Sequence, residues 1–177
     1  MPDNELITDR AERELLEYLD GMLSKGRARA SYGGQMTGID RIAQLTRAQV
    51  EDLHRLYQAE WWTKDRSMAQ VRSLLEHSDI IVAFCDSASH RLIAFARVLT
   101  DRTIKALVLD VIVDRDYRGR GLGKVLFDAI VSHPDLQNVQ HLELYCRPEL
   151  VPFYQRWGFT DALGTLRFMR LTKNVNP

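Results

Sequence analysis

A glycine-rich stretch, Arg118–Gly123, lies between an apolar run and a segment with helical periodicity. This junction restricts the folds that the chain can adopt. Glycine stands at every second position from 119 to 123, so the backbone amides there can approach a ligand closely. A helix that begins directly behind them adds amides without partners and a partial positive charge. The stretch therefore predicts an anion-binding loop between a strand and a helix, with Arg118, Arg120 and Lys124 around it.

Two common phosphate-binding patterns do not fit this loop. A P-loop requires Ser or Thr directly after its lysine, whereas Val125 follows Lys124. The dinucleotide fingerprint G-x-G-x-x-G requires a glycine where Lys124 stands. Taken alone, the loop supports an anion site, and a turn that simply needs positive φ is the alternative.

The periodicity of apolar residues predicts an alternation of strands and helices over most of the chain. Thr46 with Gln49, and Ser67 with Gln70, have the spacing of capping boxes at helix starts. The expected elements are a strand at 39–45, helices at 46–60 and 67–75, strands at 80–85, 91–99 and 105–113, a helix at 122–132, a strand at 140–146, a helix at 148–157 and a strand at 166–171. The three middle strands have short connections typical of an antiparallel meander. This order predicts an α/β fold on a mixed sheet.

The N-terminal part has a different character. Residues 8–25 carry leucines and methionine at helical spacing, and residues 26–38 are rich in glycine. We therefore expect two parts: a helical extension with a linker at 1–37, and a single folded domain at 38–177.

Composition and charge exclude several classes of function. Lys plus Arg equals Asp plus Glu at 24 each, so the chain lacks the basic excess typical of nucleic-acid binding. Because no apolar run approaches the length of a membrane span, we expect a soluble, cytoplasmic protein with no membrane partner. Cys85 and Cys146 lack metal-ligand spacing, so we expect buried free thiols and no metal site.

Three motifs together resemble one known family. Arg118-x-x-Gly121-x-Gly123 matches the [QR]-x-x-G-x-[GA] signature of the GNAT (N-acetyltransferase) superfamily. Upstream, 110–117 resembles that family's fourth strand and the turn into its cofactor loop. Downstream, Pro152–Phe159 resembles its F-Y-x-x-x-G-F segment. The resemblance covers about residues 39–172. It implies a GNAT-like mixed, mostly antiparallel central sheet flanked by helices, with a splay between the fourth and fifth strands, and makes 38–177 an acetyltransferase domain.

The resemblance implies acetyl-CoA as cosubstrate. In such enzymes the pantetheine arm lies in the splay and pairs with strand backbone, while the loop amides hold the pyrophosphate. A core strand explains the apolar side chains before the loop equally well. Carried over residue by residue, the cofactor-binding residues are Val111, Ile112, Val113, Arg118, Gly119, Arg120, Gly121, Leu122, Gly123 and Lys124.

Candidate catalytic residues are one phenol and two carboxylates. Tyr154 matches the family position of the proton donor to the leaving thiolate, and helix packing is its alternative role. Asp110 interrupts an apolar run, where a carboxylate is costly unless it faces a cleft or is paired. We expect it to bind or deprotonate the amine, with an ion pair to Arg97 as the alternative. Glu143 is the second candidate, and only one of the two carboxylates need take part.

The predicted acceptor region follows the first helix of the domain. Trp61, Trp62 and Arg66 lie in a segment that borders the acceptor site in this fold, and a tryptophan can hold a cationic amine or stack on an aromatic one. The alternative is that one tryptophan caps the core and the other packs under the loop. Arg147 stands where many family members carry Asn. It either contacts the cofactor differently or reaches the acceptor, and we place it with the substrate-binding residues.

The expected function is therefore direct acetyl transfer from acetyl-CoA to a primary amine. The charge balance and the aromatic segment favour a small molecule as the acceptor. Two alternatives stay open: acetylation of a protein N-terminus or lysine, and a non-catalytic CoA-binding regulatory module. Pairing is common in the superfamily, so the resemblance also implies a possible homodimer, with the helix at 8–25 contributing to its interface.

Overall fold

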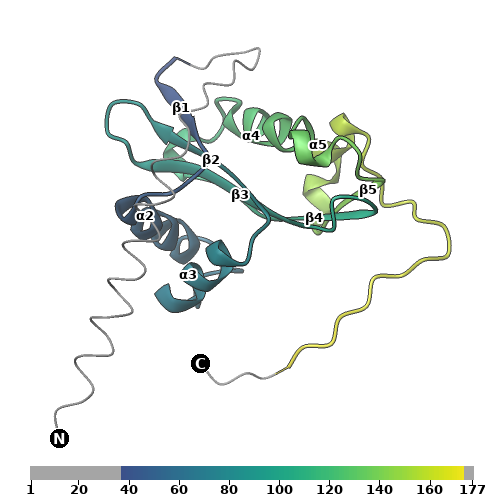
Figure 1. Ribbon diagram of the computed structural model, residues 1–177. Helices are drawn as coiled ribbons and strands as arrows, with labels where there is room; N and C mark the ends of the chain where they lie inside the picture. The colour runs from purple at the N-terminus through teal and green to yellow at the C-terminus, as the bar shows by residue number, and fades with distance from the viewer. Residues whose placement is uncertain (1–36, 174–177) are drawn as a thin grey trace, which may run out of the picture.

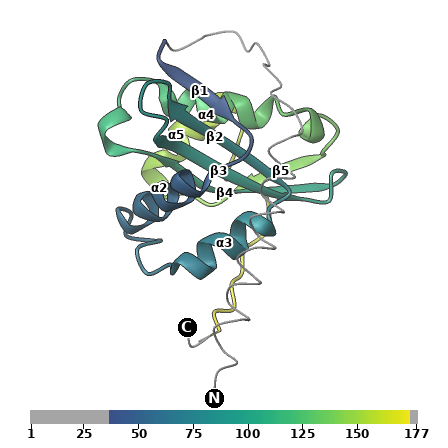
Figure 2. The ribbon, with the colours of Figure 1, turned by 60° about the vertical axis from the view of Figure 1, so that its left-hand side comes forward.

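The computed structural model describes residues 37–173, so the helix expected at 8–25 and most of the linker lie outside the described residues. Its centre is a five-stranded sheet in the order β1-β2-β3-β4-β5 (Figures 1 and 2). The strands are β1 (Ile39–Ile42), β2 (Ile80–Asp86), β3 (Leu92–Thr100), β4 (Lys105–Val113) and β5 (His141–Leu144). The first four are antiparallel and β5 is parallel to β4. The predicted mixed, mostly antiparallel sheet is confirmed.

Helices cover both faces of the sheet (Figure 1). On one face α2 (Arg47–Gln58) and α3 (Met68–Glu76) enclose a core around Leu53, Tyr57 and Phe95. On the other face α4 (Leu122–Val131) and α5 (Val151–Tyr154) enclose a larger core. Within residues 37–173, no helix has the length and apolar content needed to cross a lipid bilayer.

Both predicted capping boxes are present. Gln49 N donates to Thr46 Oγ1 at 3.3 Å, and Thr46 N donates to Gln49 Oε1 at 3.0 Å. Ser67 and Gln70 make the same reciprocal pair at the start of α3. Each box satisfies amides that a helix start leaves without partners, which fixes where α2 and α3 begin.

Strand β5 pairs along its whole length, but only with the first four residues of β4. The parallel register runs from Lys105 opposite His141 to Val108 opposite Leu144. Strand β4 then continues to Val113, while β5 ends at Leu144. The predicted splay between the fourth and fifth strands is therefore confirmed.

A β-bulge lies in β4 at the level of the splay. Phe95 pairs with Ile112 and Arg97 with Leu109, so Asp110 and Val111 together face the single residue Ala96. Asp110 has φ 54°, an uncommon value for a residue other than glycine. The bulge changes the direction of the strand where the neighbouring strand departs.

The segment predicted as a helix at 148–157 is divided into three short pieces. A 3₁₀ turn at Pro148–Leu150 precedes α5, and a second 3₁₀ turn, Gln155–Trp157, follows it. Pro152 has no amide hydrogen to donate, which limits the regular helix here. The predicted stop at Gly158 is confirmed, since this glycine has φ 85°.

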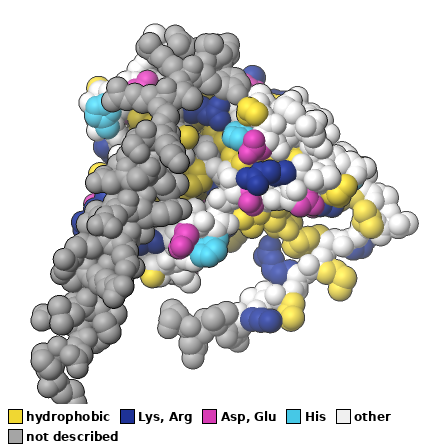
Figure 3. Space-filling model, viewed as in Figure 1, with side chains coloured by type: hydrophobic (Ala, Val, Ile, Leu, Met, Phe, Trp, Pro, Cys, Tyr) yellow, Lys and Arg dark blue, Asp and Glu magenta, His cyan; other side chains and the backbone are white. Residues whose placement is uncertain are grey.

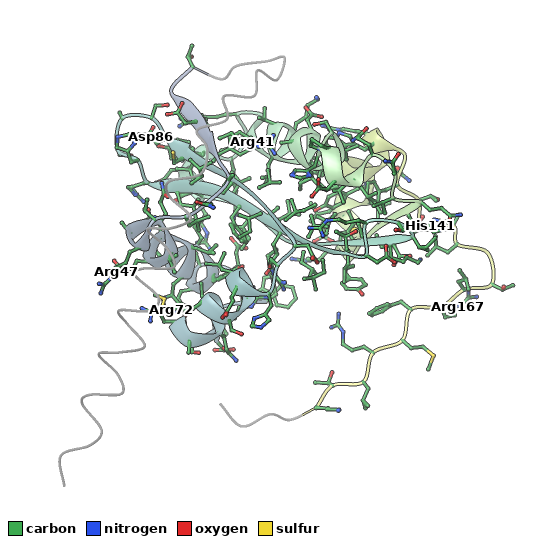
Figure 4. All side chains as sticks on the ribbon, in the orientation of Figure 1. Arg41, Arg47, Arg72, Asp86, His141 and Arg167 are labelled. Carbon is green, nitrogen blue, oxygen red and sulfur yellow. The ribbon has the colours of Figure 1, made fainter. Side chains whose placement is uncertain are left out.

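The strand predicted at 166–171 is wrong. This segment runs extended without pairing to any described strand, and its Leu166, Phe168, Met169 and Leu171 are exposed. Figure 3 shows apolar side chains along it at lower right, and Figure 4 shows Arg167 outside the layers of the fold. A short segment rich in apolar residues is compatible with a strand, but a strand also needs a neighbour to satisfy its backbone groups. The first predicted strand is likewise shorter, since β1 ends at Ile42.

Candidate active site

The glycine-rich loop presents backbone amides without protein acceptors. Gly119 and Gly121 have φ 74° and 86°, which glycine adopts without steric cost. In α4, the first backbone amides that have an acceptor are those of Lys124 and Val125. Both donate to the Gly121 carbonyl oxygen, at 2.9 and 3.1 Å. Among the hydrogen bonds between described residues, none uses the amides of 119–123 as donors. The loop therefore offers a row of free donors at a helix start, which is a suitable site for an anion.

The basic side chains of the loop are held by protein groups. Arg118 Nε donates to the Val113 carbonyl oxygen at 2.9 Å, and the same guanidinium pairs with Glu60. Arg120 lies 5.7 Å from the centre of the Tyr117 ring, and Lys124 Nζ lies 2.7 Å from Asp128. The loop's affinity for an anion thus rests chiefly on its amides.

The loop lies between the end of β4 and α5. A Cβ atom built on Gly123 would lie 3.8 Å from Phe153 Cζ and 3.9 Å from Val113 Cγ2. The end of β4 and the loop that follows it therefore meet α5, which lies about 30 residues further along the chain, and each of the three was predicted to belong to the cofactor or catalytic site.

An aromatic cluster fixes α5 against α4. The Phe127 ring lies 5.0 Å from that of Tyr154 and 4.7 Å from that of Trp157, centre to centre. Trp157 Nε1 donates to Asp128 Oδ1 at 2.9 Å, which anchors the turn after α5. These contacts hold Tyr154 in one position, although its helix has only one regular turn.

The Tyr154 hydroxyl is available for chemistry. The side chain is 7% exposed, yet its hydroxyl makes no hydrogen bond with a described residue. No fully buried side-chain oxygen or nitrogen in 37–173 lacks a partner, so this oxygen reaches solvent. Burial, followed by the nearby Cys146, raises the pKa of Tyr154 to about 12. The phenol therefore keeps its proton at neutral pH and can donate it.

Asp110 is the centre of a buried polar network. Arg66 binds both carboxylate oxygens, with NH1 to Oδ2 at 2.9 Å and NH2 to Oδ1 at 3.0 Å. Arg97 Nε donates at 2.6 Å and the Tyr57 hydroxyl at 3.0 Å. The ion pair with Arg97, considered from the sequence as the alternative role, is present, and Arg66 adds a second.

This network keeps Asp110 ionised. Burial alone opposes the charged form, but the hydrogen bonds and charges of Arg66 and Arg97 outweigh it and lower the pKa of Asp110 below its usual value. The same environment raises the pKa of Tyr57. A carboxylate with a lowered pKa and occupied lone pairs is a weak proton acceptor.

Glu143 occupies a different environment. It lies on β5, its side chain is about half exposed, and it pairs with Lys105 of β4. After β5 comes Cys146, which is exposed, so its predicted burial is wrong, whereas the predicted burial of Cys85 is confirmed. Cys146 follows the end of β5, where the sheet no longer covers it.

The four predicted substrate-binding residues form two cation–aromatic pairs. The Arg147 guanidinium lies 5.9 Å from the Trp61 ring centre, and that of Arg66 lies 5.8 Å from the Trp62 ring centre. Trp61 is 66% exposed and Trp62 is 40% exposed, so neither is a core residue. Arg147 follows β5, and the contact with Trp61 joins the segment after α2 to this end of the sheet.

A cavity of about 230 Å³ lies where α2, β4 and the glycine loop meet. Its walls include Ala59, Glu60, Val113, Arg115 and Arg118. Glu60, Arg115 and Tyr57 were not among the predicted site residues. Their partners are distant in the chain, so no local pattern marks them.

A mixed sheet that opens between two parallel strands, beside an amide-lined loop, defines the class of the protein. Residues 43–169 match the family model described as the acetyltransferase (GNAT) domain. The chain therefore belongs to the GNAT family of acetyltransferases.

Known proteins support this placement. An uncharacterized N-acetyltransferase ycf52 of Porphyra purpurea is 31% identical over 61% of this chain and 63% of its own length. Serotonin N-acetyltransferase 2, chloroplastic, of Oryza sativa subsp. japonica is 34% identical over 62% of this chain and 58% of its own length. A crystal structure of a GNAT-family protein from Xanthomonas campestris superposes with a TM-score of 0.65 at 31% identity, covering 76% of this chain and 96% of that one. The match to these two curated relatives spans about three fifths of their length.

Proposed function

We propose that this chain is an N-acetyltransferase that moves the acetyl group of acetyl-CoA directly to a small primary amine. The observation that carries this proposal is the row of amides at 119–123, which have no acceptor among residues 37–173 and lie beside the part of β4 that does not pair with β5. Pyrophosphate oxygens accept hydrogen bonds from such amides and are stabilised by the partial charge of α4. After Val108, the edge of β4 that faced β5 has no partner strand, so its backbone groups can bond the amides of the pantetheine arm.

The reaction requires two proton movements. The amine nitrogen attacks the thioester carbonyl carbon, the carbon–sulfur bond breaks, and the sulfur leaves with its electron pair. Tyr154 donates its proton to that sulfur, which its free hydroxyl and its pKa of about 12 allow. The attacking amine loses a proton to a base or to water.

We assign the two carboxylates different roles. Asp110 holds Arg66, Arg97 and Tyr57 in place and stays ionised, so we expect it to organise the acceptor side. Glu143 has a single ion-pair partner and a half-exposed carboxylate, which suits proton exchange with the amine or a bridging water.

Aromatic amines are the acceptors that we expect to be best. Two exposed tryptophans stand next to each other in the acceptor segment, where they can stack on an aromatic ring. A relative bears the name serotonin N-acetyltransferase, and serotonin is an aromatic amine of this kind. A cytoplasmic location and a homodimer stay predictions from the sequence.

A two-part experiment tests the proposal. Acetyl-CoA at saturation should raise the melting temperature, whereas the acetyl thioester of N-acetylcysteamine, which lacks the pyrophosphate, should raise it far less. Release of free thiol is then measured with arylalkylamines, aliphatic diamines and peptides bearing a free N-terminus or lysine. Absence of any shift with acetyl-CoA would refute the cofactor site. A shift without thiol release from any amine would favour a CoA-binding module, and preference for peptides would favour a protein acetyltransferase.

A further inference from the structure

Two arginines, one in the turn after β4 and one at the start of the cofactor loop, contact the segment that carries the tryptophans. Arg115 donates through NH2 to the Ala59 carbonyl oxygen, and Arg118 pairs with the Glu60 carboxylate. Both contacts fall on the two residues directly before Trp61. The cofactor loop and the acceptor segment are thus linked across a separation of 56 to 58 residues in sequence.

Arg118 connects the backbone of the anion-binding loop to Glu60. It directly precedes Gly119, the first of the free amides, and its Nε bond to the Val113 carbonyl oxygen at 2.9 Å fixes the guanidinium at the end of β4. The Gly119 and Gly121 backbones on its C-terminal side have positive φ, so this loop depends on glycine for its shape. An anion that holds the amides therefore also holds the backbone of Arg118 in place.

The Glu60 carboxylate, which pairs with Arg118, is mostly buried. Its side chain is 16% exposed, and its carbonyl oxygen accepts from the Thr63 amide at 3.1 Å. The turn that follows carries Trp61 and Trp62, whose rings meet Arg147 and Arg66. Glu60 therefore connects the Arg118 contact directly to the backbone of the two aromatic residues.

We propose that Arg118 and Glu60 are positioning residues that couple the two halves of the site. When acetyl-CoA occupies the loop, the Arg118–Glu60 pair orders Trp61 and Trp62 for the amine, so that the cofactor raises the affinity for the acceptor. Coupling between two sites usually changes affinity by roughly 5- to 150-fold, and it is reciprocal. This inference rests on the proposed function, because it requires acetyl-CoA at the loop.

Tryptophan fluorescence tests the coupling without an amine. Quenching by acrylamide is measured with and without saturating acetyl-CoA, because Trp61 is exposed whereas Trp157 is fixed by its bond to Asp128. We expect acetyl-CoA to lower the quenching constant of the wild type, and Trp61→Phe to remove most of this change. In Glu60→Gln, which keeps the shape and removes the charge, acetyl-CoA should still bind but should leave the quenching constant unchanged.

A matched control and a second variant make the outcomes distinct. Glu51→Gln removes an exposed carboxylate of α2 paired with Arg47, and it should behave as the wild type. Arg118→Lys keeps the charge but cannot bond Val113 and Glu60 together, so it should also lose the cofactor-dependent change, and it replaces Glu60→Gln if that variant fails to fold. The coupling is refuted if acetyl-CoA binds and leaves wild-type quenching unchanged, or changes it equally in the folded variant. If acetyl-CoA binds neither protein, the proposed function itself fails.

Discussion

The Tyr154 phenol combines a packed ring with a free hydroxyl, and this combination separates a proton donor from a core tyrosine. Tyr154→Phe keeps the contacts with Phe127 and removes only the hydroxyl. We expect kcat to fall by roughly 100-fold, because general acid catalysis contributes on that order, with the Kd of acetyl-CoA nearly unchanged. Thiol release and calorimetric titration measure the two quantities. Tyr145→Phe, at an exposed tyrosine, is the matched control. An unaltered kcat in Tyr154→Phe would return this residue to a packing role.

The raised pKa of Tyr154 also predicts how the reaction rate depends on pH. Its pKa of about 12 is raised, so the phenol stays protonated as the pH approaches that value. The rate should therefore increase as the amine loses its proton and then level off, with no fall between about pH 7 and about pH 10 that arises from Tyr154. A pH profile of kcat for the wild type measures this, and a fall near pH 10 that Tyr154→Phe abolishes would contradict the raised pKa.

Asp110 is a residue whose burial and partners oppose use as a base. Asp110→Asn leaves Arg66 and Arg97 without their counter-charge, so we expect a loss of on the order of 3 kcal/mol in the free energy of unfolding. Denaturant titration measures it, and Asp65→Asn at an exposed position is the control. The pH–rate profile of the folded variant should keep its midpoint. A shifted midpoint with unchanged stability would instead assign the base to Asp110.

At the scale of elements, the parts that local chemistry dictates were predictable. Both capping boxes follow from residues three apart, and the element order through α4 follows from periodicity. The partners of Asp110 did not follow, because Tyr57 and Arg66 lie 53 and 44 residues away. The strand predicted at 166–171 was wrong for a related reason, since a strand forms only where a neighbouring strand pairs with it. Motif resemblance supplied the loop, Tyr154 and the tryptophan segment, but not the contact of Arg118 with Glu60.

The start of α4 offers two glycines with opposite expectations. Gly121 has φ 86°, so Gly121→Ala should lower the free energy of unfolding by about 1–2 kcal/mol. Gly123 is helical and has only ordinary contacts for an added Cβ, so Gly123→Ala should be neutral or stabilising by up to about 1 kcal/mol. Thermal unfolding of the two variants measures the contrast.

Binding should not follow stability in this pair. The added methyl group of Gly123→Ala lies next to Val113 and Phe153, where the cofactor is expected, so the Kd of acetyl-CoA should rise even though the protein is as stable as before. A Kd equal to that of the wild type would show that the backbone at Gly123 does not closely approach the cofactor.

At the scale of the whole molecule, three carboxylates accept hydrogen bonds that favour their charged form. Asp86 accepts from Ser89 in the turn between β2 and β3, and Asp101 accepts from the Lys105 amide at the turn between β3 and β4. Asp110 joins β4 to β3, α2 and the acceptor segment. Backbone hydrogen bonds lower the pKa of the first two, and the arginines outweigh burial to lower that of Asp110. The fold is thus held at both turns and at the site by groups that titrate in the same direction.

The consequence is a defined acid limit of stability. A carboxylate whose pKa is lower in the folded state binds protons more readily when unfolded, so its contribution is complete above the usual value of 3.8 and is lost as the pH falls through the folded pKa. The free energy of unfolding should therefore stay level in this respect above about pH 5 and decline steadily below about pH 4. Urea titrations across this range measure it. In Asp110→Asn the free energy of unfolding should decline less than in the wild type, because this variant lacks the carboxylate that binds both Arg66 and Arg97. In Asp65→Asn the decline should be parallel to that of the wild type.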